Sequence, residues 1–217
     1  VLCFACIIGI MASCTQVEET ITIESMLEEM VDRNAVARFP QPDYRLKQQS
    51  SYNRASVSPE DEEGWFNNFD RNTDSTHHNF VRIEDNQGRK EWVLMEHEGA
   101  GAVVRTWMPF RGQERPETDT RIRIYLDGSQ EPVLEGNFLG LLNGDGLFPY
   151  PFAHKSLRSA VSFFPIPYAK SCKITADDHP FFFQFTYREY PEGTSVETFT
   201  MEDFVAAEPL IEEVGKK

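Results

Sequence analysis

Positive charge is scarce in this chain of 217 residues. Lys and Arg together number 21 against 35 Asp and Glu, which gives a net charge of −14. Proteins that bind nucleic acid need a basic face for the phosphates, and electrostatic docking on anionic lipid needs a cluster of Lys and Arg. The composition therefore excludes nucleic acid as a partner, and it excludes a membrane surface bound through charge.

Long apolar runs and paired cysteines are also missing. No stretch of about 18 apolar residues occurs, so the sequence predicts no membrane-spanning helix. The four cysteines are Cys3, Cys6, Cys14 and Cys172. Cys3 and Cys6 lie in an N-terminal segment that we expect to be removed, and we expect Cys14 to be acylated, so Cys172 is left alone without a disulfide framework or a metal-binding pair. We expect Cys172, which alternates with lysines, to be a small buried hydrophobe, and we expect no metal and no cofactor.

The first 14 residues resemble a bacterial lipoprotein signal. The uncharged segment 1–13 ends in Met-Ala-Ser and is followed by Cys14. It is too short to span a bilayer and has the character of a signal-peptide core; a buried N-terminal strand is the alternative. We expect lipidation of Cys14, membrane contact only through that anchor, and a location in the envelope of a Gram-negative bacterium, at the outer membrane or surface, with the periplasm as the alternative. No initiator Met or basic region precedes the segment, so we expect the natural start to be absent.

Two helical segments are predicted near the ends. Residues 15–42 are expected to form a tether and a helix capped by Ser25, with Glu28 reaching back to it. Its apolar face is predicted to be Met26, Leu27, Met30 and Val31. Residues 200–217 are predicted to form a C-terminal helix capped at Thr200 and interrupted by Pro209, which leads to a second domain absent from the chain.

The segment between the helices is predicted to be mainly β. Residues 43–79 look irregular, with a long polar loop at 48–79, whereas a period of two begins at Phe80. The predicted strands are 92–95, 102–108, 122–126, 160–166, 171–175 and 181–188. The last has Phe181, Phe183, Phe185 and Tyr187 on one face, which we assign to the core. Short strands with Gly, Asp and Pro between them indicate an antiparallel β-sandwich or jelly roll over residues 43–199.

The best candidates for chemistry are sugar-contacting side chains. Sugars stack on aromatic rings and accept hydrogen bonds from planar polar groups. Arg105 and Trp107 lie two apart in one predicted strand, and both are expected to point the same way as Val103. The polar loop adds Asn53, Arg54, Trp65, Asn67, Asn68 and Asp70. Core packing is the alternative for Trp107, and turn chemistry is the alternative for the Asn and Asp residues.

Catalytic carboxylates are harder to assign. Glu96 and Glu98 share a predicted strand face at a spacing that could suit a pair of carboxyls. We favour the plainer interpretation, an exposed acidic edge. His97 lies between them on the opposite face, and the adjacent His77 and His78 are a poor signal for a metal site.

Several longer stretches resemble one bacterial family. They are LKQQSSYNR at 46–54, EGWFNNFD at 63–70, EWVLMEHEGAGAVVRTW at 91–107, RIYLDG at 123–128, FPIPYAKSCKIT at 164–175 and YREYPEGT at 187–194. In them the chain is similar to the domain of unknown function 2961 family, whose characterised members form glycoside hydrolase family 172. The family often has Asp where this chain has Asn53. If that position contacts sugar, the Asn53 side chain keeps the hydrogen bonding of the Asp but lacks its charge.

This resemblance implies a fold, an activity and an assembly. The fold is a pair of tandem jelly rolls, and the assembly is a homotrimer or homohexamer. The activity is cleavage of fructo- or arabinofuranosyl linkages with retention, by two glutamates in the second jelly roll, beyond Lys217. We therefore expect an exported glycoside hydrolase with a carbohydrate substrate, of which this chain is the N-terminal part and is inactive alone. The alternative is a non-catalytic carbohydrate-binding or structural assembly module.

Overall fold

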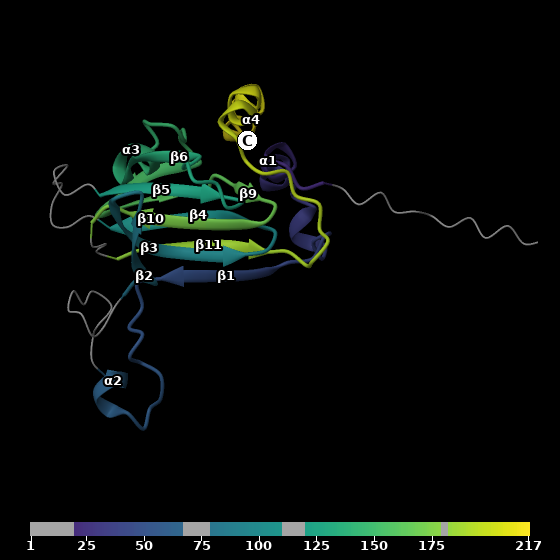
Figure 1. The fold of residues 1–217 in the computed structure, drawn as a ribbon. Coiled ribbons are helices and arrows are strands. Elements are labelled where there is room, and N and C mark those ends of the chain that lie inside the picture. Colours follow the sequence, from purple (N-terminus) through teal and green to yellow (C-terminus); the bar gives the residue numbers. More distant parts are fainter. Residues whose placement is uncertain (1–19, 67–78, 110–119, 179–181) are drawn as a thin grey trace, which may run out of the picture.

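The computed structural model describes residues 20–66, 79–109, 120–178 and 182–217. Two antiparallel sheets pack face to face as a β-sandwich, as predicted (Figure 1). The first sheet has the order β1 (Arg45–Ser50), β11 (Gln184–Glu189), β4 (Gly101–Pro109), β8 (Ser159–Ser162) and β7 (Ala153–Ser156), with β9 (Ile166–Tyr168) also paired to β4. The second has the order β2 (Arg82–Asn86), β3 (Arg89–Glu98), β10 (Ser171–Ala176), β5 (Arg121–Leu126) and β6 (Leu134–Asn137).

The core lies between the sheets, where alternate residues of each strand point inward. Phe183, directly before β11, and Phe185 on β11 are fully buried, as are Leu94 on β3 and Ile174 on β10. Each such side chain contributes about 1.5–3 kcal/mol through removal of apolar surface from water. Cys172 is also buried in this core, and burial raises the pKa of its thiol. It is therefore a packing residue, as its place in the sequence predicted.

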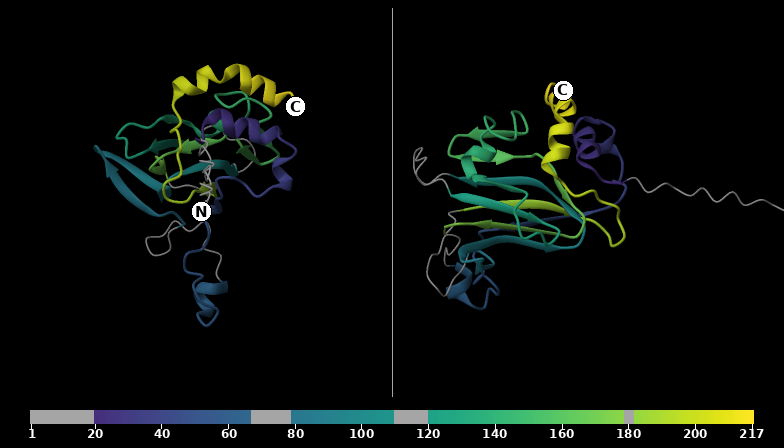
Figure 2. Two further views of the ribbon diagram at one scale, coloured as in Figure 1. Left: turned by 90° about the vertical axis from the view of Figure 1, so that its right-hand side faces the viewer. Right: turned by 45° about the horizontal axis from the view of Figure 1, so that its top comes forward.

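Short helices lie outside the two sheets. They are α1 (Ile23–Val31), the 3₁₀ turn η1 (Ala35–Ala37), α2 (Glu62–Phe66), α3 (Phe138–Leu142), α4 (Met201–Ala206) and α5 (Glu208–Gly215). Helices α1 and α5 lie against each other, so both ends of the described chain meet at one end of the fold (Figure 2). In contrast, α2 stands apart from the two sheets (Figure 1). None of the helices in the described ranges has the length and apolar character needed to cross a membrane.

The caps of the terminal helices follow local chemistry. Thr200 caps α4 by accepting a hydrogen bond from the Asp203 amide, and Pro209 lies in the first turn of a separate helix, α5, as expected. The predicted start of α1 at Ser25 is wrong. Thr22 is the cap and Ser25 is the third helical residue, and each accepts a bond from the amide of the other.

The buried face of α1 also differs from the prediction. It is formed by Ile23, Met26 and Leu27, whereas Met30 is exposed. Because the helix begins one turn earlier, its buried residues follow the spacing i, i+3 and i+4 from Ile23.

Several strands differ from the sequence prediction, and β2, β6 and β7 have no counterpart in it. Residues 45–50, expected to be irregular, form the edge strand β1, which pairs along its whole length with β11. Residues 160–166, expected to be one strand, are split into the end of β8 and the start of β9, which pair with different parts of β4. Pro165 lies in the break, where a missing backbone N–H ends a ladder.

The prediction that Val103, Arg105 and Trp107 point the same way is wrong, because β4 contains a β-bulge. Thr186 on β11 pairs with Arg105, but the next residue, Tyr187, pairs with Val103, so Val104 is an extra residue. The inward alternation therefore slips by one position. Val103 points into the core, whereas Arg105 and Trp107 lie on the outer face of the first sheet.

Candidate functional site

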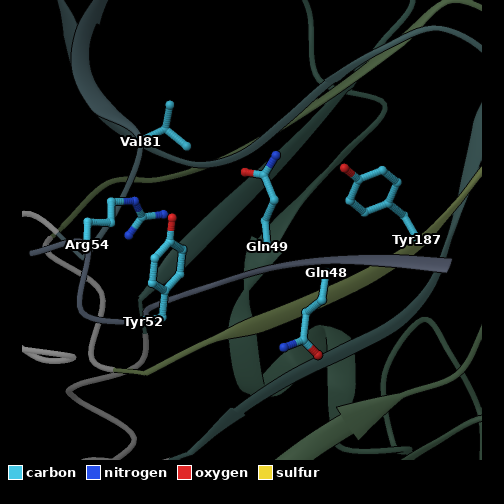
Figure 3. Close-up of a pocket in the computed structure, with 6 residues that line it drawn as sticks. All are labelled: Gln48, Gln49, Tyr52, Arg54, Val81 and Tyr187. Carbon is cyan, nitrogen blue, oxygen red and sulfur yellow. The ribbon is translucent and has the colours of Figure 1, made fainter. Parts of the chain in front are cut away.

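A cavity of about 440 Å³ opens at the edge of the sandwich beside β1 (Figure 3). Its lining residues come from β1, from the turn that follows β1, from β11 and from the residue before β2. They are Gln48, Gln49, Tyr52, Arg54, Val81 and Tyr187. Since β1 and β2 are the edge strands of the two sheets, the cavity lies where the sandwich is open at its side.

The floor of this cavity is fixed by a bond between the sheets. The side-chain amide of Gln49 on β1 donates a 2.7 Å hydrogen bond to the carbonyl oxygen of Glu96 on β3. Figure 3 shows Gln49 between Tyr187 at one end of the cavity and Arg54 with Tyr52 at the other. Polar and aromatic groups from three separate segments therefore converge on one space.

Arg54 and Tyr52 form one wall. The Arg54 guanidinium lies 4.6 Å from the centre of the Tyr52 ring and donates a 3.3 Å bond to the carbonyl oxygen of Ser50. Burial lowers the pKa of Arg54, although the guanidinium stays charged at any physiological pH. Tyr52 keeps 56% of its surface exposed. A ring stacked on a fixed cation suits a ligand with both C–H faces and hydroxyl groups.

Two other loop residues predicted to bind sugar, Asn53 and Trp65, are not among the residues that line the cavity. Asn53 is buried in the turn, where its side chain donates to the Gly64 carbonyl at 2.9 Å and accepts from the Ala55 amide at 3.0 Å. Trp65 is partly exposed on α2 and does not line the cavity. Asp70, like Asn67 and Asn68, falls outside the described residues. Sugar binding by Asn53, Trp65 and Asp70 stays a prediction.

Arg105 and Trp107 belong to a different surface. They lie on the outer face of β4, and Arg105 donates a 2.8 Å bond to the side-chain oxygen of Gln184 on β11. The predicted substrate-binding residues are therefore divided between the cavity, the turn that supports it and the outer face of the first sheet.

Glu96 and Glu98, the carboxylates weighed as a catalytic pair, are not in a comparable state. The Glu96 carboxylate accepts two hydrogen bonds from Arg82, at 2.6 and 2.8 Å, and this pairing lowers the pKa of Glu96. Glu98 is exposed at the end of β3. The same Arg82 also binds Glu84, which accepts a further bond from Lys173. Arg82 and Lys173 therefore balance the negative charges of Glu96 and Glu84. Glu96 is ionised in this arrangement, so it does not serve as the protonated acid that a retaining glycosidase needs.

His97 and the other histidines offer no metal centre within the described residues. His97 is buried between the sheets, with its Nδ1 atom 2.9 Å from the hydroxyl of Tyr168 and its Nε2 atom 3.3 Å from the carboxylate of Glu189. His77 and His78 fall outside the described residues. No group of three or more His, Cys, Asp or Glu in the described ranges is arranged to hold a metal ion.

Sequence reasoning missed several lining residues of the cavity. It selected Arg54, but not Gln48, Gln49 or Tyr187. The signal was present in the stretch at 46–54, where two glutamines precede the turn that carries Arg54. Only the pairing of β1 with β11 brings Tyr187 to the same place.

Comparison with known proteins agrees with this geometry. No curated protein matches the chain. A family model described as the GH172 first beta-sandwich domain matches residues 42–207, which span the described strands and α4. The chain therefore belongs to the GH172 family, and this match covers the sandwich that carries the cavity.

Proposed function

We propose that this chain supplies one wall of the sugar-binding site of an exported glycoside hydrolase that acts on fructo- or arabinofuranosyl linkages. The observation that carries the proposal is the cavity beside β1, where the Tyr52 ring and the Arg54 guanidinium stand next to the amides of Gln48 and Gln49. Binding sites for small polar ligands combine apolar faces with a few fixed polar groups in this way. Family membership supports glycoside hydrolysis as the chemistry of the whole protein.

The chemical step needs groups beyond this cavity. A retaining glycosidase uses two carboxyls about 5–5.5 Å apart, one ionised as nucleophile and one protonated as acid. No carboxylate lines the cavity in the described part of the chain. We therefore propose that the two catalytic glutamates belong to a second jelly roll beyond Lys217, and that Arg54 and Tyr52 bind the sugar rather than transfer protons.

Export and assembly complete the proposal. Cys14 would carry the lipid that holds the protein at the outer membrane or cell surface, with the periplasm as the alternative. Assembly as a homotrimer or homohexamer remains a prediction from the family resemblance. An exported enzyme of this kind would meet its polysaccharide substrate outside the cytoplasm.

The test uses the full reading frame, expressed with any segment that follows Lys217. Hydrolysis of aryl α-arabinofuranosides and of fructofuranosyl disaccharides is measured for the wild type and for Arg54→Ala and Tyr52→Ala. We expect both variants to lower kcat/KM about tenfold or more, equivalent to about 1.4 kcal/mol, with little change in melting temperature. Phe39→Ala serves as the matched control, because Phe39 is 92% exposed and does not line the cavity.

Three results would count against this assignment. Full activity in Arg54→Ala and Tyr52→Ala would show that the cavity does not bind substrate. Loss of turnover in Glu96→Gln, at unchanged stability, would move the catalytic pair into this chain. Absence of any turnover by the full-length protein, with sugar binding retained, would favour the alternative of a non-catalytic carbohydrate-binding module.

A further inference from the structure

Among the described residues, helices cover only part of the outer face of the first sheet. At one end α1 packs on it, where Met26 contacts Ala102 and Tyr190, and where Glu29 forms a double hydrogen bond with Arg188 at 2.6 and 3.0 Å. The rest we call the open face. It consists of the outward residues Gln48 and Ser50 on β1, Gln184 and Thr186 on β11, Arg105 and Trp107 on β4, Val161 on β8 and His154 on β7, with Tyr150 and Phe163 beside His154.

A single row of side chains crosses this face. In the strand register Ser50 pairs with Gln184, Gln184 with Trp107, Trp107 with Val161, and Val161 with His154. Five strands spaced about 4.8 Å apart give the row a length of about 19 Å. A row of this length has room for several sugar rings of an extended chain, which would contact the side chains on either side of Val161, itself buried.

Aromatic side chains gather at one end of the row. The ring of His154 lies 6.3 Å from the ring of Tyr150 and 6.4 Å from that of Phe163, measured between centroids. Tyr150 is 75% exposed and Phe163 is 40% exposed. The Nδ1 atom of His154 is buried without a hydrogen-bond partner. Exposed rings next to an unsatisfied polar atom are unusual on a surface that faces only water.

The charge of the open face differs from that of the rest of the molecule. Of the residues that define it, only Arg105 is charged, although the chain carries a net charge of −14. The outer face of the second sheet shows the opposite pattern. There Glu84, Glu91, Glu96 and Glu135 are paired with Arg82, Arg89, Arg121, Arg123 and Lys173.

We infer that the open face binds a neutral polysaccharide chain. Amides, hydroxyls and aromatic rings without carboxylates match a ligand that has hydroxyl groups and C–H faces but no charge. This inference rests on the proposed function and deepens it, because it adds a second carbohydrate contact that adjoins the cavity beside β1 through Gln48, which lines the cavity and accepts a 3.3 Å hydrogen bond from Thr186 on the open face. The open face would hold the polymer, whereas the cavity would hold the sugar at the scissile bond.

Retention of the full-length protein in native gels tests the inference. The gels contain a neutral arabinan, a neutral fructan or, as the anionic comparison, polygalacturonate. We expect retardation by a neutral polymer and not by polygalacturonate. Trp107→Ala and Phe163→Ala should each weaken the apparent affinity about tenfold, and Phe39→Ala should leave it unchanged. Phe163 is partly exposed, so its variant keeps the test valid should Trp107→Ala fail to fold.

The outcomes separate this inference from the proposed function. Arg54→Ala should lower kcat/KM about tenfold or more yet keep its retardation by polymer. Unchanged retardation in both Trp107→Ala and Phe163→Ala would overturn the inference without touching the cavity. Equal retardation by polygalacturonate would also overturn it. If sedimentation shows that Phe163→Ala dissociates an oligomer while polymer binding persists, the open face is a subunit contact and not a glycan platform.

Discussion

His97 on β3 and Glu189 on β11 face each other across the two sheets, with 3.3 Å between Nε2 and the carboxylate. Lys47 on β1 lies 2.7 Å from the same carboxylate and lowers the pKa of Glu189. His97 lowers the pKa of Glu189 further, by a smaller amount. On its other side His97 contacts the hydroxyl of Tyr168, and its ring lies 4.9 Å from that of Tyr187, which lines the cavity. This contact therefore joins both sheets next to the candidate site.

Stability should fall as the pH decreases below about 6.5. Burial lowers the pKa of His97 below its ordinary value of 6.5, although Glu189 opposes the effect and Lys47 adds to it. Below pH 6.5 the unfolded chain takes up a proton that the folded chain does not, so the free energy of unfolding decreases, by at most about 1.4 kcal/mol per pH unit for one group. Urea unfolding between pH 5 and 8 measures this slope.

His97→Gln is the matched comparison for that slope. The variant loses stability at every pH, because Tyr168 and Glu189 lose a partner, but it should show a flatter dependence between pH 5 and 7. Glu189 contributes in a separate and more acidic window, since its pKa lies below the usual 4.5. An unchanged slope in His97→Gln would mean that another group causes the dependence.

Gly101 should not tolerate a larger residue. A Cβ atom there would overlap the hydroxyl of Tyr168 and approach the backbone oxygen of Arg188 to 2.6 Å. We expect Gly101→Ala to cost about 1–3 kcal/mol, the usual range for overpacking. At Gly140 on α3 an added Cβ meets no atom within 4 Å, so Gly140→Ala should be neutral or slightly stabilising. Equal melting temperatures for the two variants would contradict this account.

The strands that sequence alone predicted share one physical property. In β5, Ile122 and Ile124 face the core while Arg121 faces outward. Because only one side of the strand is buried, apolar and polar residues alternate in its sequence. The edge strand β1 lacks that signal. Its sequence is polar on both faces, and its pairing with β11 provides the order that its own pattern does not.

The site was predictable only in part for a related reason. Arg54 is a candidate because it is a cation in a polar loop that also contains aromatic residues. Tyr187 is not, because the alternation of its strand predicts that it lies in the core. Tyr187 does point inward, but it lies beside the open edge, so one residue serves both the core and the cavity. The bulge at Val104 carries no sequence signature, and it alone separates Val103 from Arg105 and Trp107.

Lipid attachment should depend on a single thiol. The Met-Ala-Ser-Cys sequence predicts that Cys14 is acylated when the protein is expressed with an intact signal peptide. We expect labelled palmitate to be incorporated and the protein to partition with membranes, with both lost in Cys14→Ala. Cys172→Ala is the control, because that thiol is buried in the sandwich. Labelling that survives Cys14→Ala would contradict the lipoprotein assignment.

Glu91 should be the most sensitive carboxylate of the sandwich to substitution. Its side chain is fully buried on the outer face of the second sheet. It accepts hydrogen bonds from Arg89 at 2.6 Å, Thr175 at 2.7 Å and Tyr125 at 2.9 Å. Burial raises the pKa of Glu91, but the bonds from Thr175, Arg89 and Tyr125 outweigh burial and hold it below the usual 4.5. The carboxylate therefore stays ionised, and its contribution to stability is lost only as the pH falls through that lowered value.

Removing this carboxylate leaves its partners behind. Arg123, itself buried, already has two nitrogens without a hydrogen-bond partner, one of which, Nη1, lies 3.9 Å from Glu91, whereas its Nη2 pairs with Glu135 at 3.2 Å. We expect Glu91→Ala to cost about 3–5 kcal/mol, as for one partner of a buried ion pair, and Glu91→Gln to cost less, because the amide oxygen still accepts bonds. Glu98→Ala, on the exposed end of the same strand, should change stability by no more than about 0.5 kcal/mol. Chemical unfolding of the three variants measures these differences. Similar values for Glu91→Ala and Glu98→Ala would show that the network on the second sheet does not stabilise the fold.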